Sequence, residues 1–523
     1  MRTVYRNGVV HVSGPVAPAA FVVEDGRIAW LGADADAPEA DEVVDLEGAL
    51  VAPGFVDAHA QVVETGLAVS GVDLSAAVSL EQALDLLAVA AASGGTVVAH
   101  GWDETRWPEE RPPSPAEVSR AVRGQPACVV RADLERAVLS DPMVDTAGCR
   151  DLPGWADGVV SGEALERVRL SLRSDERSRS SLLSAGLAEF ARNGVVSVHE
   201  HSAPGLDTRA GLAELLGATA SAASGLPEVV GYRAELCEHA GDARGVAEEI
   251  PGLAGLGAPP VDGAITSRSA ALRSPYADAD PPACGELRVT AEQIANHVGA
   301  ATRAGLQAVL QAEGDRAMAE VLLGIQAASE VEGVEDIRAA GHRLERAAMV
   351  DAPALARILL LGLTVCGQPM MDARWGGSQG MLARRLGSVR GADLHAFADL
   401  VGAGVPVALG SGSPAGHVDP WGAVRAAALH HEPSQRLPLV AAFRAHTEAG
   451  HRAARSTESG VLRIGGPATF AVWRAAALVA EGRSGALDGA PGARLLPDLT
   501  VLDAMPTCVR TVRDGVVLFS ETA

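Results

Sequence analysis

Two histidines separated by one residue stand in a run typical of a β-strand, residues 195–201. Because side chains alternate across a strand, His199 and His201 share one face, as zinc ligands require. Further ligand or proton-transfer groups could come from three carboxylates elsewhere in the chain: Glu135, Asp262 and Glu313. The alternative is that His199 packs inside the fold and His201 faces a loop, so the pair predicts either a metal site or packing.

A second motif, PGFVDAHAQV at 53–62, resembles the first barrel strand of the amidohydrolase superfamily, where His-x-His places two metal ligands on one strand face. Other segments are similar, in the same order, to the branch that includes N-substituted formamide deformylases: GWDETRWP (101–108), DGAITSR (262–268), QAEGDRA (311–317), HRLER (342–346) and LGSGSP (409–414). The resemblance implies a barrel, a small C-terminal sheet and metal-assisted hydrolysis of non-peptide carbon–nitrogen bonds.

The ligand positions that the resemblance implies are mostly replaced. His59 is kept, whereas the remaining four positions carry Gln61, Gln311, Arg346 and Gly412. Glu135 stands where the family commonly has a histidine. An amide is a poor neutral ligand, arginine is permanently cationic and repels an ion, and glycine supplies neither a ligand nor a general base. We therefore expect no metal and no other cofactor at these positions.

The replacements suggest another chemistry. Arg346, flanked by His59, Gln61 and Gln311, could bind a carboxylate or phosphate, which would make this a small-molecule pocket selective for anions. Alternatively, Arg346 pairs with a nearby glutamate, of which Glu313, Glu135 and Glu345 are the candidates, since a buried arginine usually has an acidic partner.

The sequence is compatible with three functions. The first is a metal-free relative that binds a small, anionic molecule or has altered chemistry. The second is an active hydrolase with a single metal relocated to His199 and His201. The third is a non-catalytic scaffold or regulatory partner of an active paralogue.

The composition limits the classes of molecule that the protein is expected to bind. With 43 Lys+Arg against 66 Asp+Glu, the net charge is −23, which disfavours nucleic acid and anionic membranes. No apolar stretch has transmembrane length and the start lacks a signal-peptide core, so we expect a cytoplasmic protein, with homo-oligomers left open. The 6 cysteines are scattered, which predicts reduced thiols. The basic residues are all arginine, so no lysine chemistry is available.

The elements that must position these residues follow from hydrophobic patterns. Both ends are rich in short strands with Asn-Gly and Asp-Gly turns, which predicts a composite β-sandwich domain from residues 1–53 and 455–523. Between them, strand-like and helical runs alternate, which predicts an α/β fold with a (β/α)8 TIM-type barrel over 54–454. A segment rich in Pro, Arg and Glu, about 80–179, breaks this rhythm and is predicted to be an insertion on a barrel loop.

Individual elements are predicted as well. Strands are expected at 127–133, 195–201, 306–313, 342–346, 363–369, 405–411 and 499–502. Helices are expected at 180–192, 316–329, 353–361, 392–403 and 420–430, and a capping box is expected at Thr290 and Gln293.

Overall fold

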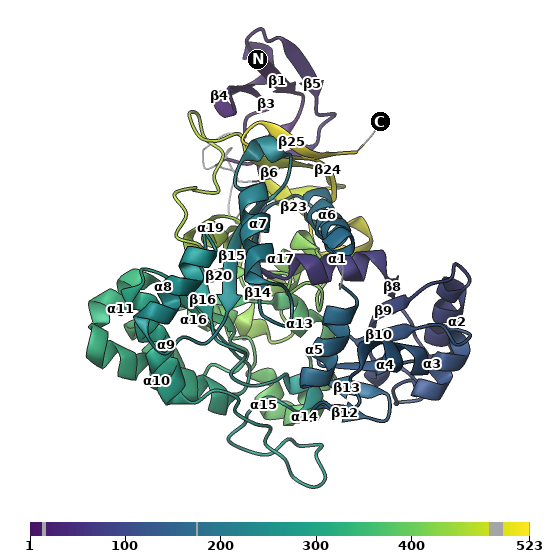
Figure 1. Cartoon of the computed structure of the whole chain (residues 1–523). Helices are drawn as coiled ribbons and strands as arrows, with labels where there is room; N and C mark the ends of the chain where they lie inside the picture. Colours follow the sequence, from purple (N-terminus) through teal and green to yellow (C-terminus); the bar gives the residue numbers. More distant parts are fainter. Residues whose placement is uncertain (13–16, 174–175, 481–494, 522–523) are drawn as a thin grey trace.

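The computed structural model describes residues 1–12, 17–173, 176–480 and 495–521. Figure 1 shows a central barrel, a lateral body that interrupts it after its first strand, and a β domain that carries both chain ends. The predicted domain ranges include 13–16, 174–175, 481–494 and 522–523, which lie outside the described residues.

The barrel is a sheet of parallel strands in sequential order. Among the described residues it has eight: β7 (Phe55–Ala60), β14 (Val195–Ser202), β15 (Glu228–Ala234), β16 (Gly255–Gly257), β17 (Gln307–Ala312), β18 (Arg343–Arg346), β19 (Thr364–Gly367) and β20 (Val407–Leu409). The sheet closes where Ala60 bridges Ser413 and the Gln61 amide donates to the Ser413 carbonyl at 3.0 Å. The predicted (β/α)8 barrel is confirmed.

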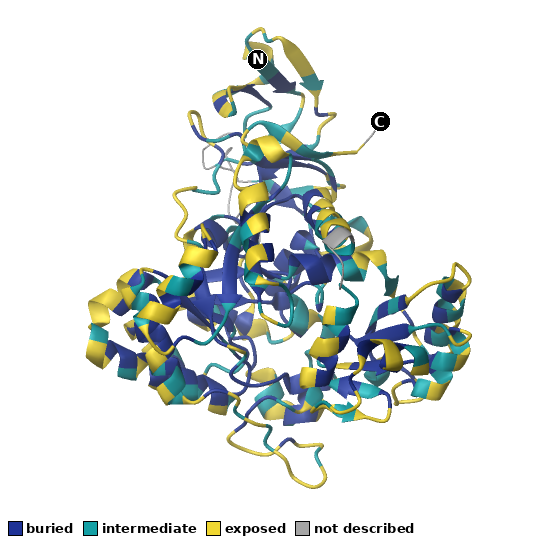
Figure 2. Cartoon of the chain, in the orientation of Figure 1, coloured by how far each residue is buried: buried dark blue, intermediate teal, exposed yellow. Residues whose placement is uncertain are grey.

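Helices cover the barrel, with exposed outer faces around buried strands (Figure 2). They are α1 (Val62–Ser70), α6 (Glu176–Arg192), α7 (Arg209–Thr219), α8 (Ala240–Glu249), α9 (Ala291–Arg303), α10 (Asp315–Glu332), α11 (Val334–Ala340), α12 (Ala352–Leu360), α13 (Pro369–Trp375), α14 (Met381–Leu386), α15 (Ser388–Ala392), α16 (Phe397–Gly402), α17 (Pro420–Ala428), α18 (Leu439–Ala445) and α19 (Glu448–Ala453).

Aromatic packing fills the N-terminal end of the barrel. Phe55, the first residue of β7, meets the Trp421 ring edge-on at 5.0 Å, and Trp421 stacks on Phe443 at 5.3 Å. This end of the barrel is therefore an apolar core, and polar side chains gather inside the barrel toward the C-terminal ends of the strands, where barrel sites form.

Local capping signals in the sequence set two helix starts. The predicted capping box is present: Thr290 Oγ1 accepts from the Gln293 amide at 3.3 Å, and the Gln293 side chain accepts from the Thr290 amide at 3.0 Å. Asp351 caps α12 by accepting from the Ala354 amide at 2.8 Å.

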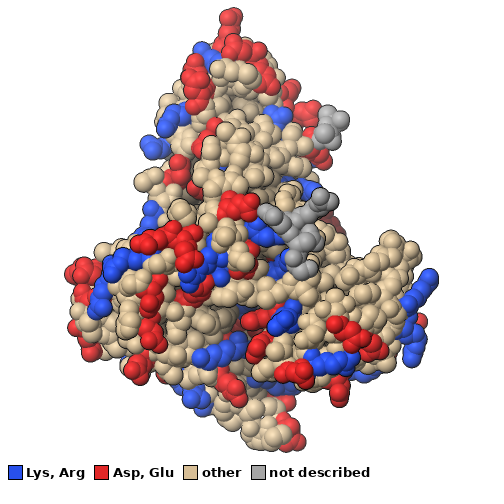
Figure 3. Space-filling view, in the orientation of Figure 1, with Lys and Arg blue, Asp and Glu red and all other residues tan. Residues whose placement is uncertain are grey.

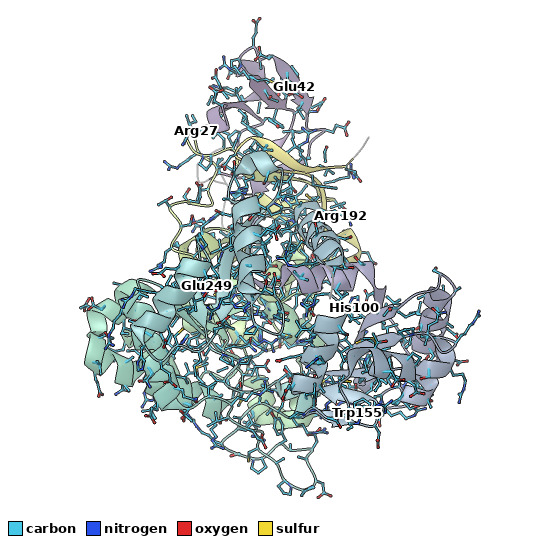
Figure 4. The ribbon with its side chains drawn as sticks, viewed as in Figure 1. Arg27, Glu42, His100, Trp155, Arg192 and Glu249 are labelled. Atoms are coloured by element: carbon cyan, nitrogen blue, oxygen red, sulfur yellow. The ribbon has the colours of Figure 1, made fainter. Side chains whose placement is uncertain are left out.

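A separate α/β body lies between β7 and β14. Its sheet contains β8 (Val72–Asp73), β9 (Val97–Trp102), β10 (Ala127–Arg131), β11 (Arg136–Leu139), β12 (Trp155–Ala156) and β13 (Val159–Ser161), and its helices are α2 (Leu80–Ala91), α3 (Pro115–Ala121), α4 (Asp141–Ala147) and α5 (Gly162–Ser171). Figure 4 labels His100 and Trp155 on this body. Trp102 and Trp107 are buried in its core, where their indole N–H groups donate to backbone carbonyls.

The β domain is built from both termini, as predicted. One sheet holds β1 (Arg2–Arg6), β3 (Ala20–Glu24), β4 (Arg27–Gly32) and β5 (Glu42–Asp45); the other holds β2 (Val9–Val10), β6 (Leu50–Pro53), β21 (Phe470–Arg474), β24 (Thr507–Arg513) and β25 (Val516–Ser520). Tyr5 stacks on Phe21 at 4.6 Å, and both meet Phe470 edge-on, so aromatic rings from both chain ends share one core.

Some predicted elements differ from the structure. The strand predicted at 499–502 is wrong: Asp498 accepts hydrogen bonds from the Thr500 amide and hydroxyl, and this turn leads into a short 3-10 helix, Leu502–Ala504. The helix predicted over 392–403 is not continuous: Ala392 ends α15, and a new helix, α16, covers only Phe397–Gly402. A short antiparallel pair, β22 (Leu478–Ala480) and β23 (Leu495–Pro497), completes the described strands.

In the described part of the chain, none of the helices combines the length and hydropathy needed to cross a bilayer. On the face seen in Figure 3, arginine and acidic side chains are interspersed.

Candidate functional site

Three side chains from three different strands meet inside the barrel. His59 on β7 lies 2.7 Å through Nδ1 from Glu345 Oε2 on β18, and His201 Nε2 on β14 lies 3.8 Å from the same oxygen. The two imidazole rings stack with their centroids 4.0 Å apart. These three ligand atoms lie within 4.8 Å of one another, so the described residues contain a group with the composition of a metal site. We call it the lumen cluster.

A buried arginine contacts the lumen cluster. Arg343, two residues before Glu345 and therefore on the same strand face, donates from Nε to Glu345 Oε1 at 3.0 Å. Its other nitrogens donate to the Ala58 carbonyl at 2.7 Å and contact His199 Nδ1 at 2.9 Å. The guanidinium also lies over the Tyr232 ring, 4.5 Å from its centroid.

Electrostatics fix the charge states of these groups. Burial alone would raise the pKa of Glu345, but Arg343 together with the two neighbouring histidines holds it well below its usual range. Burial lowers the pKa of His199, with Arg343 adding to the effect, and burial next to His59 lowers that of His201. At neutral pH, an Arg343–Glu345 ion pair is thus bordered by neutral His199 and His201.

A neighbouring pocket opens beside Arg346. It is lined by Asp133, Ala264, Ile265, Thr266, Glu313, Arg346, Ala348, Gln368, Met371, Trp375, Leu382 and His395. Arg346 ends β18 in the left-handed backbone region, φ 66°, and forms an ion pair with Glu313. Of the two alternatives for Arg346, the structure therefore contains the acidic partner, and the partner is Glu313.

The insertion supplies one wall of this pocket. Asp133 follows β10 and pairs with Arg131, while it also accepts from the Thr266 hydroxyl at 3.0 Å. Burial raises its pKa in isolation, but Arg131 and the hydroxyl donors keep it below its usual range. Glu135, two residues further along, is not part of the lining; its side chain lies 3.4 Å from Arg288, and burial raises its pKa.

Gln368 fills the space next to Gly412. A Cβ built on Gly412 would lie 2.5 Å from Gln368 Oε1, and the glycine has φ 66°, which side chains rarely adopt. Both polar atoms of the Gln368 amide are buried without a hydrogen-bond partner among the described residues, as are Arg346 Nε and His395 Nδ1. The pocket thus presents several unsatisfied polar atoms to one space.

The remaining predicted site residues make hydrogen bonds that involve backbone groups. Asp262 accepts from the amides of Ala271, Glu313 and Gly314 at 2.8–3.0 Å, so it fixes the loop after β17. Burial raises its pKa to about 7. Gln61 precedes α1 and its carbonyl accepts from Thr65, while the Gln311 carbonyl accepts from the Val261 amide.

The structure places the predicted site residues in separate groups. It brings His201 together with His59 and Glu345, whereas His199, the predicted partner of His201, contacts Arg343 instead. The carboxylates also fail to converge: Glu313 pairs with Arg346, Asp262 holds amides and Glu135 faces Arg288. Sequence reasoning missed Arg343, Gln368 and His395; the alternation of Arg343 and Glu345 on a short strand was the available signal.

The chain thus combines a closed parallel barrel, with polar groups at the C-terminal strand ends, and a β domain built from both termini. The Amidohydrolase family model matches residues 42–519. The chain belongs to this family.

The chain is also similar to individual proteins. The chain is 24% identical over 494 residues to Protein LONG AFTER FAR-RED 3 of Arabidopsis thaliana, covering 86% of this chain and 82% of that one. A crystal structure of an uncharacterized metal-dependent hydrolase from Pyrococcus horikoshii has a TM-score of 0.70 at 22% identity, covering 90% of this chain and 97% of that chain, and shows the fold. Imidazolonepropionase of Mycolicibacterium smegmatis is 57% identical over 53 residues, 10% of this chain and 13% of its own length, so the match spans a small part of that enzyme.

Proposed function

We propose that this amidohydrolase-family chain binds a small polar molecule in the pocket beside Arg346 and does not hydrolyse it with a metal held at positions 59, 61, 311, 346 and 412. The observation that carries the proposal is the Arg346–Glu313 ion pair, which places a permanent cation and its partner inside the pocket.

The residues at those positions do not fit the family's metal. The Arg346 guanidinium would repel a dication, and Glu313, the nearest carboxylate, is already committed to it. Gly412 has no donor, and the Gln368 amide fills the adjacent space.

The polar atoms of the pocket indicate what it accepts. Arg346 Nε is a donor, the Gln368 amide offers one donor group and one acceptor, and burial lowers the pKa of His395 to about 4, so its imidazole is neutral near pH 7. Trp375, Met371 and Leu382 add apolar surface. This set favours a neutral, planar molecule with both donor and acceptor atoms.

An anion is the second candidate ligand, and it is favoured by the arginine alone. Glu313 already neutralises Arg346, and Asp133 adds another carboxylate to the lining, so a carboxylate or phosphate would enter beside two acidic groups. Hydrolysis, cytoplasmic location and self-association of the chain remain predictions.

The test is calorimetry and thermal shift with matched pairs of small probes, such as benzamide against benzoate and phenylurea against phenyl phosphate. We expect the neutral members to bind and Gln368→Ala to weaken them at least about tenfold, since a buried hydrogen-bond partner is lost. Gln326→Ala, on an exposed face of α10, is the control. Selective binding of the anionic probes that is lost in Arg346→Met would support the anion instead, and failure of every probe would count against the pocket.

A further inference from the structure

We propose that Asp103 of the insertion is a specificity-determining positioning residue of the pocket beside Arg346, and that this pocket takes an aryl amide or aryl urea whose ring packs against Trp375. The inference rests on the function proposed above, because it concerns the ligand of the same pocket. It names the class of ligand, and it assigns the choice of ligand to a residue outside the pocket lining.

One hydrogen bond joins the insertion to the aromatic wall of the pocket. The indole Nε1–H of Trp375, the last residue of α13, donates to Asp103 Oδ2 at 2.9 Å, although the two residues are 272 positions apart in the sequence. Both residues are buried, since Trp375 keeps 3% and Asp103 keeps 4% of its surface exposed. Because a hydrogen bond to a carboxylate is stronger than one between neutral groups, this contact fixes the orientation of the indole ring.

The second oxygen of the Asp103 carboxylate is bound within the insertion. Asp103 Oδ1 accepts from the Thr105 amide at 3.1 Å and from the Thr105 hydroxyl at 2.6 Å. This turn directly follows β9, so the backbone of the insertion sets the position of Oδ2. Asp103 therefore couples the position of the insertion to the position of Trp375.

A further contact from the same segment reaches this ring. The Arg374 guanidinium lies over the Trp375 ring, 5.1 Å from its centroid, and Arg374 Nη2 donates to the Gly101 carbonyl at 3.1 Å. Residues 101–103 thus hold both the indole N–H and the arginine that lies over the ring.

The lining of the pocket has an apolar and a polar part. Trp375 belongs to the same buried hydrophobic cluster as Ile265 and Leu382, whereas Gln368 and His395 contribute unsatisfied polar atoms. A ligand that contacts both parts needs a flat apolar group joined to a head with donor and acceptor atoms. An aromatic group gains free energy against Trp375 beyond its buried area, so aryl amides and aryl ureas suit this pocket.

The residue after Asp103 holds a different wall. Glu104 accepts from Arg131 Nε at 3.0 Å and from Arg131 Nη2 at 2.8 Å, and Arg131 pairs with Asp133 in the lining. Because Asp103 holds the aromatic wall and Glu104 the acidic one, Glu104→Gln is a direct comparison for Asp103→Asn.

Asp103→Asn tests the positioning role, because it keeps the size of the side chain and replaces one acceptor oxygen by an NH2 group. Thr105 supplies two donors and Trp375 one, so we expect the amide oxygen to stay with Thr105 and the NH2 group to face the indole N–H. The first readout needs no ligand. It is the indole ¹⁵N–H signal of Trp375 in an NMR spectrum of the full chain, which has 7 tryptophans, and loss of the signal in Trp375→Phe assigns it. Asp103→Asn should shift this signal and speed its exchange with solvent at least about tenfold.

The second readout is calorimetry with benzamide and cyclohexanecarboxamide, which share the amide head and differ in the ring. The wild type should bind benzamide about three- to tenfold more tightly, and Asp103→Asn should lose most of that preference. If Asp103→Asn does not fold, Trp375→Phe takes its place, because it removes the indole N–H and keeps an aromatic ring.

The matched control is Asp498→Asn. Asp498 accepts from the Thr500 amide and hydroxyl in the same pattern that joins Asp103 to Thr105, but it is outside the pocket lining. This variant should change neither readout.

The possible results separate this inference from the proposed function. An unshifted Trp375 signal in Asp103→Asn, or a shift of the same size in Glu104→Gln, would overturn the positioning role. An unchanged preference for benzamide in folded Asp103→Asn would overturn the role in specificity. If the signal shifts as expected but no protein binds either probe, the proposed pocket is rejected together with its ligand class, whereas the contact between Asp103 and Trp375 is retained.

Discussion

Arg343 and Glu345 lie two residues apart on β18, and both side chains point into the barrel, where they form an ion pair with 0% and 1% of their side-chain surfaces exposed. The barrel interior is thus organised around one desolvated pair of charges, to which His59, His199 and His201 are joined.

Removing one partner of that pair should be costly. For Arg343→Met we expect the free energy of unfolding to fall by about 3–5 kcal/mol, because Glu345 would stay buried without its cation. Chemical denaturation measures it. The double variant Arg343→Met/Glu345→Gln should lose less than the sum of the two single variants, and strict additivity would contradict the coupling.

Gly412 and Gln368 compete for one volume. Gly412→Ala should destabilise the protein by about 1–3 kcal/mol, because its Cβ would contact the Gln368 amide. In a Gln368→Ala background the loss should shrink to the cost of the left-handed backbone, about 1 kcal/mol. The melting temperatures of the wild type, the two single variants and the double variant measure these losses. An equal loss in both backgrounds would show that Gln368 does not clash with the added Cβ.

Two buried carboxyl groups predict a pH dependence of stability. Burial raises the pKa of Glu200 to about 8, although its Oε2 accepts from the Val62 amide at 2.6 Å, and burial raises that of Asp262 to about 7. Because both folded-state pKa values exceed the unfolded ones, their stabilisation is complete below about pH 4 and is lost as pH rises through 7 and 8. The melting temperature should therefore fall between pH 5 and pH 9, and less so in Glu200→Gln. Identical slopes would reject the role of Glu200.

Asp262 should act through the loop that it anchors. Asp262→Asn replaces one acceptor oxygen by a donor, so at least one of the three amides loses its partner, at an expected cost of about 1–3 kcal/mol. Since one of those amides is the backbone N–H of Glu313, which lines the Arg346 pocket, probe binding in that pocket should weaken as well. The control is Asp315→Asn, because Asp315 also accepts a backbone hydrogen bond nearby but is only half-buried.

Sequence patterns predicted much of the fold and less of the site. Alternation and capping signals located β14, β17, α9 and α12 to within a few residues. β16, with only Gly255–Gly257, carries no such signal, because neighbouring strands define it. His59 and His201 were identified from their residue types. Their contact with Glu345 depends on closure of the barrel, because His201 and Glu345 are 142 and 286 residues after His59 in the sequence.

The pocket wall that carries Asp133 belongs to the insertion, whereas the lumen cluster is carried by barrel strands alone. Substitutions in the inserted segment can therefore change which molecules the pocket binds without changing the lumen cluster. The ligand selectivity of the pocket and the polar residues inside the barrel can consequently evolve at different rates.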